Sequence, residues 1–109
     1  MSDYDKLAAG NETSVGEALV AYLEARGVSV VFGIPGVHTV EMYRGLGQAK
    51  LRHVTPRHEQ GAAFMAEVYG RLTGHTAGCL GTLGPGATNL ITGVADSNMD
   101  RSPMLVLTG

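Results

Sequence analysis

The chain has 109 residues, enough for one domain with a hydrophobic core and close to the lower limit for a complete enzyme. Its formal net charge of −2 is spread over scattered acidic and basic residues, which argues against binding to nucleic acid or to an anionic membrane. The lone Cys79 excludes a disulfide framework and no apolar run is long enough to span a membrane, so we expect a cytoplasmic protein.

Capping and turn signals divide the first part of the chain into a leader, a helix, a strand and a turn. Residues 1–11 are expected to form a flexible leader, and residues 12–109 the folded domain. The pair Ser14 and Glu17 forms a capping box that predicts the start of a helix, and Gly27 predicts its end. A β-branched run over residues 28–32 then predicts a buried strand, followed by a turn at Gly33-Ile34-Pro35-Gly36.

The remaining sequence repeats this alternation of strands and helices. We expect a short helix over 39–46, a strand over 51–54, a helix from Glu59 to Gly74, a strand over 78–83, a helix from Pro85 to about Asn98 and a strand over 103–107. Short connections between alternating elements predict an α/β fold, a parallel sheet with helices on both faces. Ligands of such sheets bind at the carboxyl ends of the strands.

The helix that begins at Glu59 has one face of small residues. At helical spacing this face comprises Glu59, Ala62, Ala63, Ala66 and Gly70. We expect the small face to contact a partner subunit. The bulkier residues of the helix are then expected to bury it against its own sheet; they are Phe64, Met65, Val68 and Leu72.

Single motifs leave several functions open. The pattern Gly84-x-Gly86-x-x-Asn89 resembles a dinucleotide fingerprint, but it lacks the acidic residue that should follow, and a tight strand-to-helix turn explains its glycines equally well. The four histidines are not at ligand spacing, so the sequence predicts no metal site. His58 is either an acid/base partner of Glu59 or a surface residue. Glu59 itself is either a functional acid or a charge that complements the helix dipole.

Three segments together resemble a known family. They are Val31 to Tyr43, containing Gly33-Ile34-Pro35-Gly36; Arg57-His58-Glu59-Gln60-Gly61-Ala62-Ala63-Phe64-Met65-Ala66; and Gly84-Pro85-Gly86-Ala87-Thr88-Asn89 with Asp100-Arg101-Ser102-Pro103-Met104. In this order and spacing they resemble the pyrimidine-binding domain of thiamine-diphosphate-dependent enzymes. The similarity is to the acetolactate-synthase-like group, which includes 2-oxo acid decarboxylases such as 5-guanidino-2-oxopentanoate decarboxylases.

The resemblance implies a role for five residues. Glu59 would be the catalytic glutamate that hydrogen-bonds N1′ of the cofactor's aminopyrimidine and so activates the cofactor. A carboxyl on a water-excluded face should have a raised pKa, which suits a group that shares a proton near neutral pH. The residues expected to bind the cofactor are Pro35, Glu59, Thr82, Pro85 and Asn89.

The same resemblance implies a longer enzyme. Relatives hold the diphosphate and Mg²⁺ through a Gly-Asp-Gly motif that this sequence lacks, so we expect a domain incomplete at its C-terminus and inactive alone. The intact enzyme would be a homodimer or tetramer with cofactor at the subunit interface and a 2-oxo acid as substrate; whether it carries FAD stays open. Two alternatives are a half-module that pairs with a separate diphosphate-binding chain, and a nucleotide-binding α/β protein without thiamine chemistry.

Overall fold

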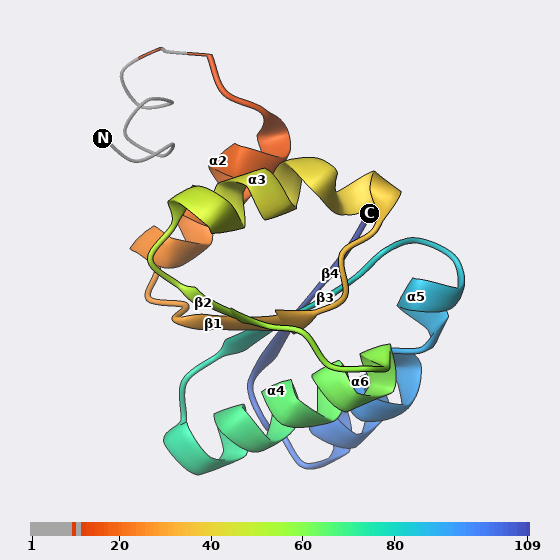
Figure 1. Cartoon of the computed structure of the whole chain (residues 1–109). Coiled ribbons are helices and arrows are strands. Elements are labelled where there is room, and N and C mark those ends of the chain that lie inside the picture. The colour runs from red at the N-terminus through yellow and green to blue at the C-terminus, as the bar shows by residue number, and fades with distance from the viewer. Residues whose placement is uncertain (1–9, 11) are drawn as a thin grey trace.

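Strands and helices alternate along the computed structural model, which describes Gly10 and residues 12–109 (Figure 1). The leader expected over residues 1–11 lies, apart from Gly10, outside the described residues. The elements in chain order are α2 (Val15–Ala25), β1 (Val30–Gly33), the 3₁₀ helix η1 (Val37–Thr39), α3 (Val40–Gln48), β2 (Arg52–Val54), α4 (Glu59–Thr73), β3 (Ala77–Gly81), α5 (Pro85–Thr88), α6 (Ile91–Met99) and β4 (Met104–Thr108).

The four strands form a parallel sheet in the order β2-β1-β3-β4. In the register of the sheet, Val31 pairs with His53 on one side and with Gly78 on the other. All five residues of β3 are buried, as expected for a central strand covered on both faces. The parallel sheet predicted from the sequence is therefore confirmed.

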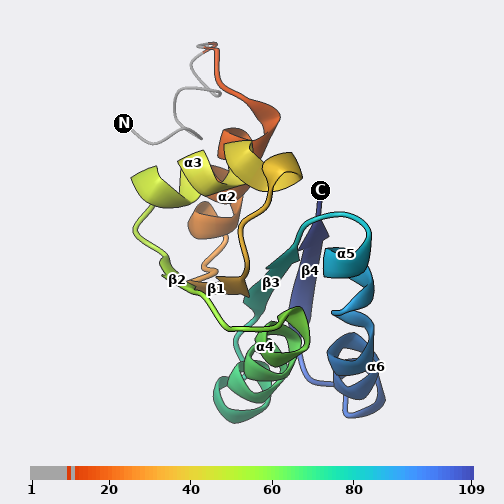
Figure 2. The same cartoon turned by 45° about the vertical axis from the view of Figure 1, so that its right-hand side comes forward.

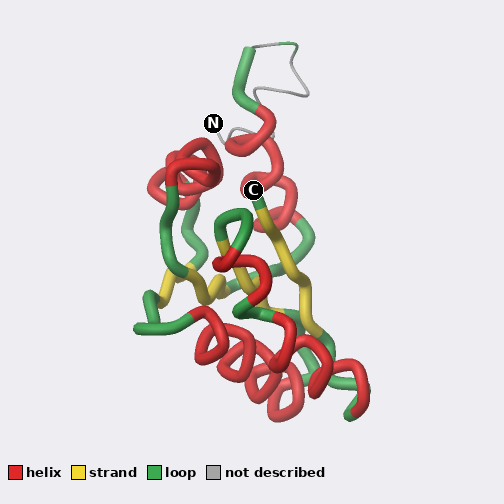
Figure 3. Tube along the Cα trace, turned by 90° about the vertical axis from the view of Figure 1, so that its right-hand side faces the viewer, coloured by secondary structure: helices red, strands yellow, loops and turns green. Residues whose placement is uncertain are grey.

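Helices cover both faces of this sheet. Helices α2 and α3 lie on one face, and α4 and α6 lie side by side on the other (Figures 1 and 2). The tube in Figure 3 shows the same layers, with strands between two groups of helices. The α/β architecture expected from the sequence is confirmed. Among the residues described, no helix combines the length and the apolar character that crossing a membrane requires.

Local sequence signals set most of the helix boundaries. The Ser14 hydroxyl accepts a hydrogen bond from the Glu17 amide at 3.1 Å, which caps α2 as predicted. At the other end Gly27 adopts φ 91°, and after α4 Gly74 adopts φ 73°, both in the left-handed region that favours glycine. The expected helix ends at these two glycines are therefore confirmed.

One helix predicted from Pro85 to Asn98 is instead two helices, α5 and α6, separated by Asn89 and Leu90. The turn tightens there, because the Leu90 amide donates to the Ala87 carbonyl three residues earlier, at 3.1 Å. Leu90 is 1% exposed and joins the core, while the Asn89 side chain bonds to α4. Different tertiary contacts at two adjacent residues accompany the break, and local propensity does not reveal them.

The two faces of α4 are the reverse of the prediction. Ala62, Ala63 and Ala66 are completely buried inside this chain, in the core cluster that includes Cys79 and Leu90. Of the four bulkier residues, Met65, Val68 and Leu72 lie toward solvent, 41%, 44% and 79% exposed, while Phe64 is half-buried. The expectation that the small face contacts a partner subunit was wrong, because that face provides the close contact of α4 with its own sheet and with α6.

Candidate active site at the carboxyl end of the sheet

Glu59 is the first residue of α4 and follows the carboxyl end of β2. His58 precedes it as the N-cap, and its ring Nδ1 accepts a hydrogen bond from the Gln60 amide at 3.0 Å. Of the two interpretations of His58, this geometry shows a surface residue that caps the helix. The cap orients the first turn of α4 and so places the Glu59 carboxyl at the edge where ligands of parallel sheets bind.

A hydrogen bond joins Glu59 to a residue far away in the sequence. Asn89, between α5 and α6, donates from its side-chain Nδ2 to Oε2 of Glu59 at 3.0 Å. The Asn89 amide lowers the pKa of the Glu59 carboxyl, helped by the Glu59 backbone N–H and the charge of His58, although burial acts in the opposite direction.

The expectation of a raised pKa for Glu59 was therefore wrong for this chain. The side chain of Glu59 is only half-buried, so desolvation is weaker than the stabilisation that the Asn89 amide gives to the carboxylate. The prediction assumed that the small face of α4 excludes water around the acid. That face instead lies inside the core, and the acid lies beyond it.

Two glycines, Gly36 after β1 and Gly86 in α5, pack closely on Thr82. A Cβ atom added to Gly36 would lie 2.6 Å from Cβ of Thr82, and one added to Gly86 would lie 2.9 Å from its Cγ2. The position of that added atom at Gly86 is also 3.7 Å from Oε1 of Glu59. Both positions require a residue without a side chain, and Gly86 lies between Thr82 and the carboxyl group.

The Thr82 hydroxyl is a buried polar atom without a protein partner. Among the described residues, Oγ1 of Thr82 is one of two buried side-chain oxygens that form no hydrogen bond. Its oxygen lies toward Gly36, 2.8 Å from the position of a Cβ atom added there, while its methyl Cγ2 lies toward Gly86. Buried polar groups almost always have a partner, so the unpaired hydroxyl indicates a position where a polar ligand group would bind. This observation fits a heteroaromatic ring that offers its own donors and acceptors.

The structure places the five expected cofactor-binding residues in two groups. Glu59, Thr82 and Asn89 come together around Gly86. Pro35 and Pro85 are exposed, and each precedes one of the two glycines that pack on Thr82. The sequence analysis treated Gly36 and Gly86 only as turn residues. The repeated Pro-Gly pair after β1 and β3 is the signal that could have identified them as close-packing residues.

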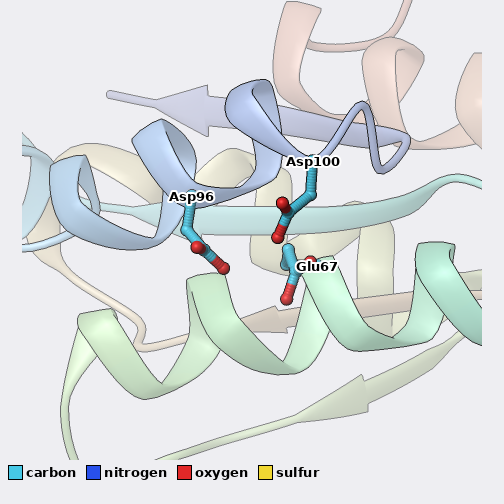
Figure 4. Close-up of side chains that lie close together, drawn as sticks. All are labelled: Glu67, Asp96 and Asp100. Carbon is cyan, nitrogen blue, oxygen red and sulfur yellow. The ribbon is translucent and has the colours of Figure 1, made fainter.

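An acidic cluster lies elsewhere, between α4 and the end of α6. Carboxylate oxygens of Glu67, Asp96 and Asp100 lie within 4.8 Å of one another (Figure 4). The guanidinium group of Arg71 hydrogen-bonds to Glu67 and Asp100, and its Nη2 lies 3.9 Å from Asp96. Arg71 already supplies the positive charge that a cation would bring, so the cluster is an ion-pair network that ties α4 to the C-terminal end of α6.

A comparison with protein families identifies the fold. Residues 13–109 match a family model described as "Thiamine pyrophosphate enzyme, N-terminal TPP binding domain". The chain belongs to this family. Thiamine diphosphate is therefore the cofactor that family membership implies, and the match covers the whole sheet together with the loops around Glu59.

Several curated relatives of this thiamine pyrophosphate domain are named as a decarboxylase or as acetolactate synthase subunits. A "Probable 2-ketoarginine decarboxylase" of Pseudomonas aeruginosa is 50% identical over 95 residues, which cover 87% of this chain and 17% of the relative. A "Probable acetolactate synthase large subunit" of Methanococcus aeolicus is 48% identical, covering 85% of this chain and 16% of the relative. The acetolactate synthase isozyme 1 large subunit of Escherichia coli is 44% identical, covering 85% and 17%. The thiamine pyrophosphate domain thus spans a small part of the length of each relative.

Proposed function

We propose that this chain forms the aminopyrimidine-binding part of a thiamine-diphosphate-dependent enzyme that acts on a 2-oxo acid. The reaction would be that of a decarboxylase or of an acetolactate-synthase-like carboligase. One observation carries the proposal: the Glu59 carboxyl, at the first turn of α4 and at the carboxyl end of the sheet, is held by Asn89 beside Gly86, which also packs on the methyl group of Thr82. The names of the relatives support the substrate class.

Each residue of the site has a role in the proposed chemistry. Thiamine diphosphate supplies the electron sink for cleaving or forming the bond next to the 2-oxo group. The Glu59 carboxyl shares a proton with ring nitrogen N1′, as a general acid–base group. The Thr82 hydroxyl would supply a hydrogen-bonding group for the ring, and Pro35 and Pro85, each next to a glycine that packs on Thr82, would line the pocket.

The rest of the cofactor needs a second protein surface. The one cluster of acidic groups found among the described residues already holds the guanidinium group of Arg71, so we place the diphosphate and Mg²⁺ on another domain. Glu59 is half-buried here, and covering it would remove water and raise its pKa toward the range in which it can share a proton. A homodimer or tetramer with the cofactor at a subunit interface would provide that cover.

The test of Glu59 uses a graft in which residues 13–109 replace the matching segment of the Pseudomonas aeruginosa decarboxylase. In this graft Glu59→Gln keeps the size of the side chain but removes the acidic proton. We expect turnover to fall about 10²–10⁴-fold, the usual contribution of general acid–base catalysis, with a much smaller change in cofactor affinity.

A matched control separates catalysis from helix stability. Glu41 lies in the first turn of α3, as Glu59 does in α4, so Glu41→Gln removes an equivalent helix-start charge away from the site. The control should keep nearly full turnover. Equal turnover of the Glu59→Gln graft and the unsubstituted graft would contradict the proposal, as would an equal loss in the Glu41→Gln control.

A further inference from the structure

The backbone of Asn89 is fixed by a hydrogen bond of its own amide and by the burial of the next residue. It occupies the break between α5 and α6, where its backbone amide donates to the Pro85 carbonyl at 2.9 Å. The next residue, Leu90, is 1% exposed and anchors the turn in the core. The Asn89 side chain is therefore presented to α4 from a fixed backbone, and its Nδ2 reaches Oε2 of Glu59 at 3.0 Å.

The two oxygens of Glu59 have different surroundings. Oε2 accepts the Asn89 amide, whereas Oε1 lies toward Gly86, 3.7 Å from the position of an added Cβ atom there. In the part of the chain that the structure describes, Asn89 is the side chain that hydrogen-bonds the Glu59 carboxyl. On the side of Oε1, Gly86 has no side chain that would fill the space, so that side is available to a ligand.

We infer that Asn89 is a positioning residue for Glu59, which engages Oε2 and leaves Oε1 as the oxygen that meets the bound ring. This inference rests on the proposed function and deepens it, because it assigns the Asn89 side chain to the glutamate and not to the cofactor. The hydrogen bond also keeps the carboxyl ionised in the ligand-free chain, since an N–H donor stabilises the charged form.

Few charged groups act on this carboxyl. On its own element His58 is the ionisable neighbour, and its charge lowers the pKa of Glu59 further. From the loop after β3 and from α5 and the turn after it, Glu59 faces Thr82, Gly86 and Asn89, none of which ionises. A change in Glu59 titration on substitution of Asn89 therefore reports the hydrogen bond itself, while His58 acts equally in all variants.

The test measures the titration of the Glu59 carboxyl by NMR in the cofactor-free chain of 109 residues. Asn89→Ala removes the donor, so the pKa of Glu59 should rise toward its ordinary value. Asn89→Asp keeps the shape but replaces the donor with a second acid, so the two carboxyls should titrate as a coupled pair with one pKa higher still. Asn98→Ala removes the same side chain from an exposed position of α6, so it should leave the pKa of Glu59 unchanged.

A second signal comes from the Asn89 side-chain amide protons. Their resonances should shift with the same midpoint as Glu59 in the parent chain and stop shifting in Glu59→Gln. Identical Glu59 titration in the parent, Asn89→Ala and Asn89→Asp would overturn the inference, and so would amide resonances that ignore the ionisation of Glu59. Because no cofactor is present, this result is independent of the turnover of the graft, and the proposed function and the positioning role can fail separately.

Discussion

At the residue scale, the ligand-free chain holds Glu59 in its charged form. The donor from Asn89 lowers the pKa of the carboxyl, and its half-exposed position leaves desolvation too weak to reverse this. The raised pKa expected from the sequence requires a covered site, which a single chain does not provide. The proposed subunit interface would therefore change both the surroundings of Glu59 and its proton affinity.

A second contact between ionisable side chains involves Tyr43 and His53. The Tyr43 hydroxyl and Nε2 of His53 are 2.9 Å apart, which joins α3 to β2. Burial lowers the pKa of His53 from 6.5, partly offset by a hydrogen bond to the Gly33 backbone, and burial raises the pKa of Tyr43 to about 12. Both residues are therefore neutral in the folded chain near neutral pH.

The lowered pKa of His53 predicts a loss of stability in mild acid. The unfolded chain binds a proton more readily than the folded one, so the stabilising contribution is complete above pH 6.5 and declines as pH falls below it. Urea unfolding of the parent between about pH 5 and about pH 7.5, around the unperturbed histidine value, should show this decline. In His53→Gln, which cannot ionise, the decline should be smaller.

The control for this measurement is His75→Gln. His75 is exposed, so its substitution should leave the pH dependence of the parent intact. Parallel curves for the parent and His53→Gln across the whole range would show that His53 does not contribute.

At the element scale, α4 and α6 approach closely because small residues face each other. A Cβ atom added to Gly93 would lie 2.4 Å from Cβ of Ala63, closer than real contacts allow. Likewise, one added to Gly70 would lie 2.2 Å from the Pro103 carbonyl oxygen. The stripe of small residues in α4 thus contributes to the fold of this chain, whatever contacts an assembled enzyme adds.

Gly93→Ala should therefore destabilise the chain. Overpacking a tight contact costs about 1–3 kcal/mol, which we expect to exceed the better helix propensity of alanine. Adding Ala63→Gly to the same chain removes the clashing methyl group and should recover part of the loss. Chemical denaturation gives the free energy of unfolding for each variant.

Gly47→Ala is the matched control for this helix contact. Gly47 is exposed in α3 and has no neighbour within 4 Å of an added Cβ atom, so the same substitution should stabilise the chain by about 0.4–1 kcal/mol. If Gly93→Ala were as stabilising as Gly47→Ala, α6 would not pack on Ala63 as described.

At the scale of the whole molecule, the proposed function divides the cofactor site, with the pyrimidine side on this chain and the diphosphate side on another domain. We predict that the chain of 109 residues binds thiamine diphosphate with Mg²⁺ negligibly by calorimetry, since the metal-ligand cluster found among the described residues lies away from the candidate site and is occupied by Arg71. The graft that supplies the remaining domains should bind it. Micromolar, Mg²⁺-dependent binding to the chain alone would contradict this division of the site.

Much of the fold could be predicted because its signals are local. Ser14 and Glu17 cap a helix through atoms three residues apart, and Gly27 and Gly74 end helices through their own backbone conformation. Alternating strands and helices allow few topologies other than a parallel sheet. The same order placed Glu59 and the loop after β3 at one edge of the sheet, so the sequence alone was enough to predict that these segments lie together.

Tertiary contacts determined the rest. Whether the small face of α4 packs inside the chain or against another subunit depends on which surface lies next to it. Here Ala63 packs on Gly93, which follows it by thirty residues in the sequence. The ionisation of Glu59 depends on the Asn89 amide, which reaches it only because α5 and α6 separate at Leu90. Periodicity reveals that a helix has two faces, but burial and pairing depend on the neighbours that long-range packing brings to each face.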